Sequence, residues 1–309
     1  MKQNKICSIS VDLDPIGHYL KARGYSPYPK TNLNAIYDDA LPRMVEIFDR
    51  YEIKATFFVV GKDLKNKENR DRIFNLANNG HEIANHTYSH FQNFFELDFK
   101  SKQKEIENAD KIISDCTGKK VNGFRAPGWG INRDVFEVLE KNSYFYDSSV
   151  FPSKLLSIIS YANFILNRGK LQSTIGSSSR IGRSPKQPYR PDSKKLWKKG
   201  KSSIVEIPLT VLPYFQFPFL GSTLYLFGTS FFNLCFNYFK LFNRPLVYEF
   251  HGLDLVDYFS NIEDERLLVK PGLGKEIHEK INLYEHCLSK FSNNYNFNTM
   301  YELAWSLKV

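Results

Sequence analysis

Cysteine is scarce in this 309-residue chain, and its four cysteines lie far apart, with no pair separated by two positions. A disulfide framework or a structural zinc knuckle would need cysteines in a regular, closely spaced pattern. We therefore expect reduced thiols. Hydrophobic residues make up 42% and charged residues 24% of the chain, which fits a folded protein with a sizeable core.

A secretory signal is also missing from the start of the chain. Residues 1–5 are polar, and the apolar run that begins at Ile6 is interrupted by Asp12 and Asp14. The pattern predicts a cytoplasmic protein, with attachment to a membrane surface as the alternative. No internal repeat and no linker is visible, so we expect one domain over residues 1–309, with an insertion at 151–243.

Acidic residues are nearly absent from the segment 168–201, which holds eleven lysines and arginines and a single acid, Asp192. The formal net charge of the whole chain is +9, so this segment carries all of the excess. A segment of this kind binds nucleic acid, anionic lipid or a phosphorylated substrate, or it is a solvated loop. Nucleic acid is the partner that we do not favour.

Charged residues are missing altogether from residues 207–239. A run of this length could reach across a bilayer, but three prolines, two glycines and two asparagines interrupt it. We expect a continuous helix only at 227–242, with polar groups on one narrow stripe formed by Ser230, Asn233, Asn237 and Lys240. The apolar segment 207–242 should be buried, or it should lie in a membrane interface as a peripheral contact.

Strand and helix patterns alternate at close spacing along the chain. Apolar runs predict strands at 5–13, 55–60, 82–85, 121–124, 143–146, 203–208 and 245–250. Amphipathic patterns predict helices at 37–51, 70–79, 97–116, 133–141, 155–166 and 275–291. Residues 15–34 are expected to form a loop, and 298–307 a last short strand and helix. Such alternation is typical of a parallel sheet or barrel in an α/β fold.

Polar residues suited to catalysis follow several of these strands. Asp12 and Asp14 end the first strand and, being two apart, share a face. His86 and His90 follow the third strand, and two imidazoles four residues apart make half of a divalent-metal site. Such a pair alone is more often two solvated histidines. A second carboxylate and a separate histidine, such as His251, would suit a general base and a general acid.

Five stretches carry a resemblance to a known family. They read Ser10-Val-Asp-Leu-Asp14, Ala55-Thr-Phe-Phe-Val-Val-Gly61, Gly80-His-Glu-Ile-Ala-Asn-His-Thr-Tyr-Ser-His90, Phe124-Arg-Ala-Pro-Gly128 and Glu249-Phe-His251. Together they resemble the polysaccharide deacetylases, carbohydrate esterase family four, over most of residues 6–150 and again near residue 250. The resemblance implies an α/β fold, a distorted (β/α)7-type barrel of mostly parallel strands, here with a basic and partly apolar insertion.

Carried over residue by residue, the resemblance implies that His86, His90 and one of the two aspartates bind the metal. We assign Asp14 as this ligand and Asp12 as the catalytic base, with the reverse assignment as the alternative. Zinc is the expected ion, although cobalt, nickel or iron would suit the same donors.

The remaining roles also follow from the resemblance. Arg125 would keep the base ionised, and His251 would protonate the leaving amine. Substrate contacts are expected from Pro127, Gly128, Asp147 and Trp197. Two departures from the family pattern fall among these residues: many members carry tyrosine at the position of Gly128, and their aspartate near a tryptophan has no clear counterpart here.

The resemblance implies a metal-dependent hydrolase of carbohydrate metabolism that removes an N-acyl group, first of all acetyl, from an amino sugar. The basic segment favours a phosphate-bearing substrate, such as a nucleotide-linked or polyprenyl-phosphate-linked sugar, and the apolar segment suits a lipid-linked one. The alternatives are a hydrolase of a non-sugar amide and a non-catalytic barrel that binds carbohydrate or lipid.

Overall fold

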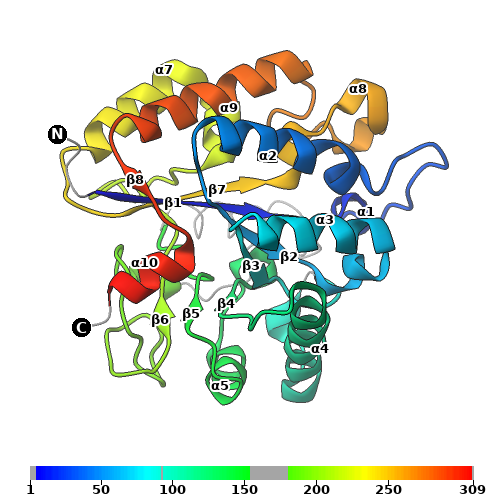
Figure 1. Ribbon diagram of the computed structural model, residues 1–309. Helices are drawn as coiled ribbons and strands as arrows, with labels where there is room; N and C mark the ends of the chain where they lie inside the picture. Colours follow the sequence, from blue (N-terminus) through cyan, green and yellow to red (C-terminus); the bar gives the residue numbers. More distant parts are fainter. Residues whose placement is uncertain (1–4, 92, 154–179, 308–309) are drawn as a thin grey trace, which may run out of the picture. The chain divides into compact units, whose positions relative to one another are not determined.

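The computed structural model describes residues 5–91, 93–153 and 180–307 (Figure 1). The helix expected at 155–166 and the basic residues before 180 lie outside these ranges. The chain divides into two compact units. The first unit comprises Met1–Phe57 and Phe219–Thr299, and the second comprises Phe58–Pro218 and Met300–Val309.

The first unit is built on three parallel strands. β1 (Ile6–Asp12) pairs with β7 (Leu246–His251), from Cys7 opposite Leu246 to Asp12 opposite His251. β8 (Asn296–Phe297) pairs with β1 at its start. The side chains of β1 from Cys7 onward are buried, as expected for a parallel strand covered on two faces.

Aromatic side chains form the core of the first unit. Its longer helices are α2 (Leu41–Arg50), α7 (Gly221–Phe239) and α9 (Ile277–Ser292), and its short ones are α1 (Ile16–Lys21) and α8 (Tyr258–Asn261). α7 and α9 pack on each other. Rings from α7, β7 and α9 meet between them, with centroid distances of 4.9 Å for Tyr248–Phe291 and 5.8 Å for Phe232–Phe291. Contacts of this kind add to the stability from burial.

The second unit has shorter strands, again parallel. β3 (Glu82–Asn85), β4 (Gly123–Phe124), β5 (Tyr146–Asp147) and β6 (Val205–Glu206) pair in chain order. β4 and β5 approach closely because Gly123 has no side chain: a Cβ there would lie 2.0 Å from Cζ of Tyr146. The Tyr146 hydroxyl donates a hydrogen bond to Oε1 of Glu82 at 2.8 Å, which ties β5 to β3.

Side-chain caps start the main helices of the second unit. α3 (Lys67–Asn78), α4 (Phe99–Thr117) and α5 (Arg133–Lys141) begin after Asn66, Asp98 and Asn132, whose side chains accept hydrogen bonds from backbone N–H groups of the first turn. α4 ends at Gly118, whose φ of 66° is the left-handed conformation of a helix C-cap. The last helix is α10 (Met300–Ser306).

The hydrogen-bonded order of the strands is β6-β5-β4-β3-β2-β1-β7, with β8 beside β1 and with β2 at Thr56–Val59. Every strand pair whose register is given is parallel. Strands alternate with helices along the chain, as Figure 1 shows. The α/β fold with parallel strands predicted from the alternation is therefore present.

One predicted loop contains a helix. Residues 15–34 were expected to be irregular, but α1 occupies Ile16–Lys21 directly after Pro15. Ile16, Tyr19 and Leu20 are buried, and their spacing of three and four is that of a helix face. The prediction was wrong because this pattern covers less than two turns, so tertiary burial decides the conformation. The last strand also ends before 298–307, where only a helix forms.

The charge-free segment forms a longer helix than expected. α7 begins at Gly221 and ends at Phe239, whereas the prediction was a continuous helix at 227–242, and the non-helical Gly228, with φ 74° and ψ −177°, interrupts it. Glycine adopts this backbone conformation without the steric cost that a Cβ would add. Among the described residues, no helix has the length and hydropathy needed to cross a membrane.

Candidate metal and catalytic site

The two N-terminal aspartates lie at the end of β1 and are buried, with exposed fractions of 3% for Asp12 and 7% for Asp14. The hydroxyl of Tyr19 donates a hydrogen bond to Oδ2 of Asp14 at 3.0 Å. Burial and the Asp14 charge raise the pKa of Tyr19 well above its ordinary value, so the hydroxyl remains a donor. Helix α1, which the sequence pattern did not predict, thus orients one proposed metal ligand.

Two cations of the first unit lie beside the same tyrosine. The Nζ atom of Lys270 lies 4.2 Å from the centroid of the Tyr19 ring, and Nη1 of Arg23 donates to the Tyr19 carbonyl oxygen at 3.3 Å. Burial and the nearby Arg23 lower the pKa of Lys270 to about 8, although Asp14 opposes this effect. These two cations had not been singled out from the sequence, because they lie in loop and helix-end positions without a motif.

A second group of titratable residues lies at the ends of β1 and β7. Ligand atoms of Asp12, Glu249 and His251 lie within 4.8 Å of one another. Glu249 and His251 are two apart on β7 and therefore share a face. The backbone N–H of His251 donates to Oδ2 of Asp254 at 2.9 Å, which fixes the turn after the strand. Glu249 was part of a quoted motif, but it had been given no role.

The negative charges around His251 change its titration. Burial alone lowers the pKa of His251, but the charges of Glu249, Asp14, Asp12 and Asp254 outweigh this effect, so the pKa is raised. A histidine with a raised pKa stays protonated to a higher pH. This property suits a group that must donate a proton.

The two motif histidines follow β3 in a loop with unusual backbone angles. Thr87 and His90 have φ of 64° and 50°, and the loop is held by the Asn85 side chain, which accepts from the Thr87 N–H at 2.7 Å. The His86 and His90 rings are 4.8 Å apart and buried. Nδ1 of His86 lies 2.7 Å from the carbonyl oxygen of Arg125. A carbonyl can only accept, so Nδ1 carries the proton and Nε2 is left as the metal-binding nitrogen.

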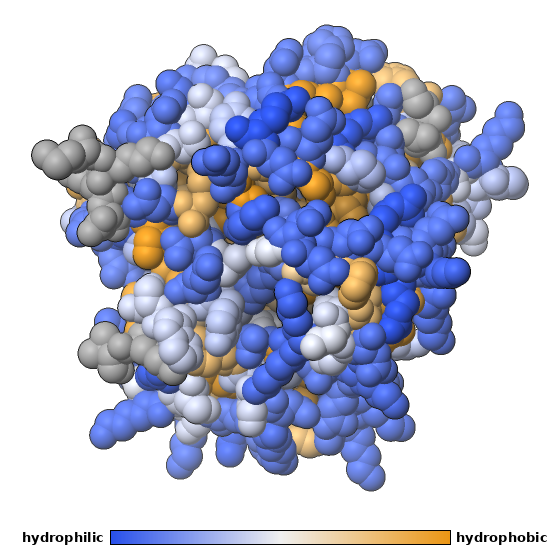
Figure 2. Space-filling view, viewed as in Figure 1, coloured by the Kyte–Doolittle hydropathy of each residue, from blue (hydrophilic) through white to orange (hydrophobic). Residues whose placement is uncertain are grey.

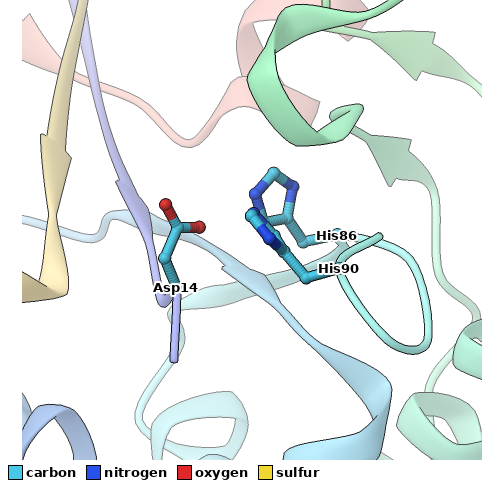
Figure 3. A group of neighbouring side chains, drawn as sticks. All are labelled: Asp14, His86 and His90. Carbon is cyan, nitrogen blue, oxygen red and sulfur yellow. The ribbon is translucent and has the colours of Figure 1, made fainter. Parts of the chain in front are cut away.

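Asp14, His86 and His90 form a group whose ligand atoms lie within 4.8 Å of one another (Figure 3). Figure 3 shows the two imidazoles side by side, opposite the Asp14 carboxylate. Two neutral nitrogens and one carboxylate oxygen fit a zinc ion and leave a coordination position open, as in hydrolytic zinc sites. His86 bonds through Nδ1 with the Arg125 carbonyl oxygen, and Asp14 accepts through Oδ2 from the Tyr19 hydroxyl. Hydrogen bonds of this kind orient the side chains that bind a metal.

Arg125 follows β4 and is fully buried. Its Nε and Nη2 donate to the carbonyl and hydroxyl oxygens of Ser148 at 3.1 and 3.0 Å, and its guanidinium lies 4.1 Å from the ring centroid of Phe58. These contacts hold the guanidinium in one place. The predicted role of Arg125, to keep the base ionised, stays a prediction.

A pair of buried carboxyl groups lies at the ends of β5 and β6. Asp147 is opposite Glu206 in the strand register, and neither has appreciable exposed surface. Oδ1 of Asp147 accepts from the Ser149 hydroxyl at 2.6 Å, and Oε1 of Glu206 accepts from the Val150 N–H at 3.0 Å. Burial raises the pKa of both groups, and the Asp147 charge raises that of Glu206 further. The pair therefore retains a proton to a higher pH than two separate, exposed carboxyl groups would.

The other expected substrate residues lie in different surroundings. Pro127 and Gly128 belong to a short 3-10 helix, Pro127–Trp129, in which Gly128 has a φ of 59°. A left-handed residue is strained as tyrosine, which gives a reason for glycine at this position. The half-buried Trp197 has the Arg180 guanidinium 5.3 Å from its ring centroid. Asp147 is a buried group with internal partners, so its predicted contact with substrate stays a prediction.

The described part of the basic segment is a loop with exposed cations. Lys194, Lys195, Lys198, Lys199 and Lys201 are all exposed, while Asp192 accepts hydrogen bonds from the backbone N–H groups of the first two. The arrangement agrees with a solvated loop and leaves these lysines accessible to an anionic ligand.

Comparisons with known proteins agree with this geometry. The family model for polysaccharide deacetylase matches residues 30–146. A peptidoglycan deacetylase of Helicobacter pylori is 26% identical over 152 residues, which are 48% of this chain and 51% of that protein. The chain thus spans about half the length of this curated relative.

Solved structures extend the likeness to the whole chain. A candidate polysaccharide deacetylase from Mycobacterium smegmatis has a TM-score of 0.60 at 15% identity, covering 100% of this chain and 91% of its own. An allantoinase has a TM-score of 0.59 at 13% identity, covering 98% of this chain and 90% of its own. At these identities the structures show the fold, which is the (β/α)7-type α/β fold that we predicted. The resemblance predicted from the motifs is confirmed as well, because the polysaccharide deacetylase model matches residues 30–146 and the Helicobacter deacetylase is similar over about half of the chain.

Proposed function

We propose that this chain is a metal-dependent hydrolase that removes an N-acyl group, acetyl in the first place, from an amino sugar. The observation that carries the proposal is the group formed by Asp14, His86 and His90, whose donors suit zinc. The family match over residues 30–146 and the deacetylase activity in the name of the Helicobacter relative support the same reaction.

The roles of the residues follow from their surroundings. Asp14, His86 and His90 would hold the ion, which supplies Lewis-acid chemistry by acidifying water and polarising an acyl carbonyl. Asp12 accepts the proton of the attacking water, because it is a buried carboxylate at the same strand end as Asp14. His251 donates a proton to the departing amine, and its raised pKa keeps that proton available.

Cations of the first unit support a substrate that carries phosphate. Lys270 and Arg23 both contact Tyr19, whose hydroxyl binds the metal ligand Asp14. A phosphate group near these side chains would favour the protonated form of the Lys270 amine, whose pKa burial lowers to about 8. We propose a nucleotide-linked or polyprenyl-phosphate-linked amino sugar as the substrate class, and a cytoplasmic location remains our prediction for the protein.

Metal content and activity test this function together. We expect the purified protein to bind about one zinc ion per chain by mass spectrometry, and to release acetate from N-acetylglucosamine 1-phosphate. His86→Ala should lose the ion and the activity, whereas the exposed His278→Ala should keep both. A His86→Ala protein with unchanged zinc content and turnover would falsify the metal assignment.

The phosphate specificity has its own control. Lys270→Met should raise KM for N-acetylglucosamine 1-phosphate and leave KM for N-acetylglucosamine nearly unchanged, because only the first substrate has the anionic group. An equal effect on both substrates would argue against phosphate recognition by this lysine.

A second candidate function is hydrolysis of a non-sugar amide, which the structural likeness to an allantoinase favours. Assays with allantoin and with acylated amines beside the amino sugars would decide between the two. A non-catalytic barrel is the weaker alternative, because Asp12, His251 and the proposed metal ligands are all present in the chain.

A further inference from the structure

Helix α7 has one face that the first unit buries. Phe232, Cys235, Phe236 and Phe239 each have an exposed fraction of at most 3%. Phe232 and Phe236 contact Phe291 of α9 with centroid distances of 5.8 and 5.6 Å. Burial of this face accounts for part of the helix's apolar character.

The opposite face of α7 is apolar and exposed. The exposed fractions are 51% for Phe227, 68% for Leu234 and 78% for Leu241, and Phe231 and Tyr238 are half-buried. Steps of three and four residues place Phe231, Leu234 and Tyr238 on one face of the helix that follows Gly228. Phe227 precedes the non-helical Gly228, and Leu241 lies in the turn after the end of α7. We call this set the α7 stripe: Phe227, Phe231, Leu234, Tyr238 and Leu241. Neighbouring rings contact one another, with centroid distances of 4.9 Å for Phe227–Phe231 and 5.3 Å for Tyr238–Phe242.

The face drawn in Figure 2 is mostly hydrophilic, with hydrophobic residues visible as separate patches. Scattered apolar residues of this kind are normal on a protein surface, whereas the α7 stripe gathers three exposed and two half-buried large apolar side chains. The exposed part of the α7 stripe is therefore a candidate contact surface.

The charged residues that follow α7 in the chain are positive. Residues 221–239 carry no charged side chain, and the next charged residues in the chain are Lys240 and Arg244. Nζ of Lys5 donates to the carbonyl oxygen of Lys240 at 2.8 Å, so a third cation lies at the C-terminal end of the helix. Within residues 5–91, 93–153 and 180–307, no acidic side chain forms a salt bridge with Lys5, Lys240 or Arg244.

We infer that the α7 stripe binds the surface of a lipid bilayer that contains anionic phospholipids. An amphipathic helix with phenylalanine, tyrosine and leucine on one side and cations at its end lies in the plane of the interface, with its rings at the headgroup level. The phosphates of the lipids neutralise Lys5, Lys240 and Arg244. Because α7 carries no acidic side chain, its insertion does not require the desolvation of a carboxylate, and no carboxylate on the helix repels the lipid phosphates.

A second copy of the chain is the competing occupant of the stripe. In a symmetric dimer with parallel α7 helices, the two C-terminal ends, each with three cations, would lie together and repel each other. In a dimer with antiparallel helices, the cations of each copy would have no counter-charge. Anionic lipid satisfies the apolar side chains and the cations together. For this reason we commit to the bilayer, and self-association is an outcome that the experiment must distinguish.

Vesicle flotation tests the proposal with the full chain. Wild-type protein should float with phosphatidylcholine vesicles that contain phosphatidylglycerol, and much less with phosphatidylcholine alone. Leu234→Glu and Leu241→Glu should each lower the partition coefficient by about tenfold, because an exposed leucine that enters the bilayer is replaced by an anion. Leu226→Glu is the matched control, since Leu226 is 59% exposed on the same helix but off the stripe, and it should change partitioning by less than about twofold.

Two further measurements keep the outcome decisive. Arg244→Glu should weaken binding and reduce its salt dependence, since it removes a cation from the interface. Circular dichroism and release of acetate from a water-soluble substrate should be unchanged in all four variants, so the proposal stands or fails separately from the proposed function. Equal flotation of Leu234→Glu and wild type would overturn it. So would a wild-type dimer that Leu234→Glu dissociates, without any binding to vesicles.

Discussion

Two cross-strand pairs, one in each unit, each contain a buried carboxyl group at the end of a strand and behave differently. Asp12 lies opposite His251 at the end of β1 and β7, and Asp147 lies opposite Glu206 at the end of β5 and β6. In the first unit an imidazole joins the carboxylates, so opposite charges stabilise each other and the histidine pKa rises. In the second unit two carboxyl groups face each other, so burial favours the protonated form.

The comparison shows that strand register alone does not define a catalytic group. A position at the carboxyl end of a parallel strand brings side chains together. Whether the result is an ionised acid–base pair or a proton-sharing structural pair depends on the residue opposite.

Among substitutions in the two pairs, we expect Asp12→Asn to have the largest effect on activity. If Asp12 is the base, the variant should lower kcat/KM by ~10²–10⁴, since a positioned proton acceptor contributes about that much. Glu206→Gln, in the corresponding position of the second unit, should stay within about tenfold of wild type. Zinc content measured on the same samples should be unchanged. Loss of zinc in Asp12→Asn would instead exchange the roles of Asp12 and Asp14.

A smaller effect is expected from the hydrogen bond that orients Asp14. Tyr19→Phe removes the hydroxyl 3.0 Å from Oδ2 of Asp14 and keeps the ring. Zinc affinity, measured by competition with a chromophoric chelator, should fall by about 10- to 100-fold, as when other outer partners of metal ligands are removed. Tyr28→Phe is the matched control, because that hydroxyl is exposed and donates to Glu265. Equal zinc affinity of Tyr19→Phe and Tyr28→Phe would show that the Tyr19 hydroxyl does not support zinc binding.

The pH dependence of turnover sharpens the comparison further. A general acid must be protonated, so activity falls as the pH rises through the pKa of His251. The Glu249 charge raises this pKa, so Glu249→Gln should move the alkaline limb of the profile to lower pH. At pH 8 the rate should fall by roughly tenfold or less. An unmoved limb would show that another group titrates there.

The smallest effect concerns stability and the second pair. The pKa of Glu206 is raised in the folded state, so between the unfolded and the folded pKa the native protein binds more protons than the unfolded chain. Stability therefore falls as pH rises through that window, with a slope of up to about 1.4 kcal/mol per pH unit. Urea unfolding between pH 4.5 and 8 should show a flatter profile for Glu206→Gln. Parallel profiles for wild type and variant would mean that the pair carries no such proton.

Local patterns predicted most of what lies near the proposed metal site. The strand before Asp12 and the short strand before His86 were recognised because buried runs and turn residues mark them within a few positions. Glu249 could have been found as well, since residues two apart on a strand share a face with His251. The motif alone gave Glu249 no role, because only the histidine at its end has an obvious catalytic function.

Other features depend on contacts between distant parts of the chain. The Asp147–Glu206 pair exists because β5 and β6 lie side by side, and each of these strands has only two residues. The sequence predicted strands at 143–146 and 203–208, but local patterns do not show that Asp147 and Glu206 lie opposite each other. Helix α1 is similar: six residues are too few for a helical pattern, and its conformation is decided by burial of Ile16, Tyr19 and Leu20. The exposure of one face of α7 also could not be read from a segment that is apolar on most sides.

The tight fit of Gly123 against Tyr146 has a consequence for protein engineering. Because the tyrosine ring occupies the volume that a side chain at 123 would need, the two positions cannot vary independently. A library randomised at both should return complementary sizes, with alanine at 123 accompanied by a residue smaller than tyrosine at 146. Such compensated doubles would also lose the hydroxyl that binds Glu82, and would thereby report how much the anchoring of β5 to β3 matters for the loop that follows β4.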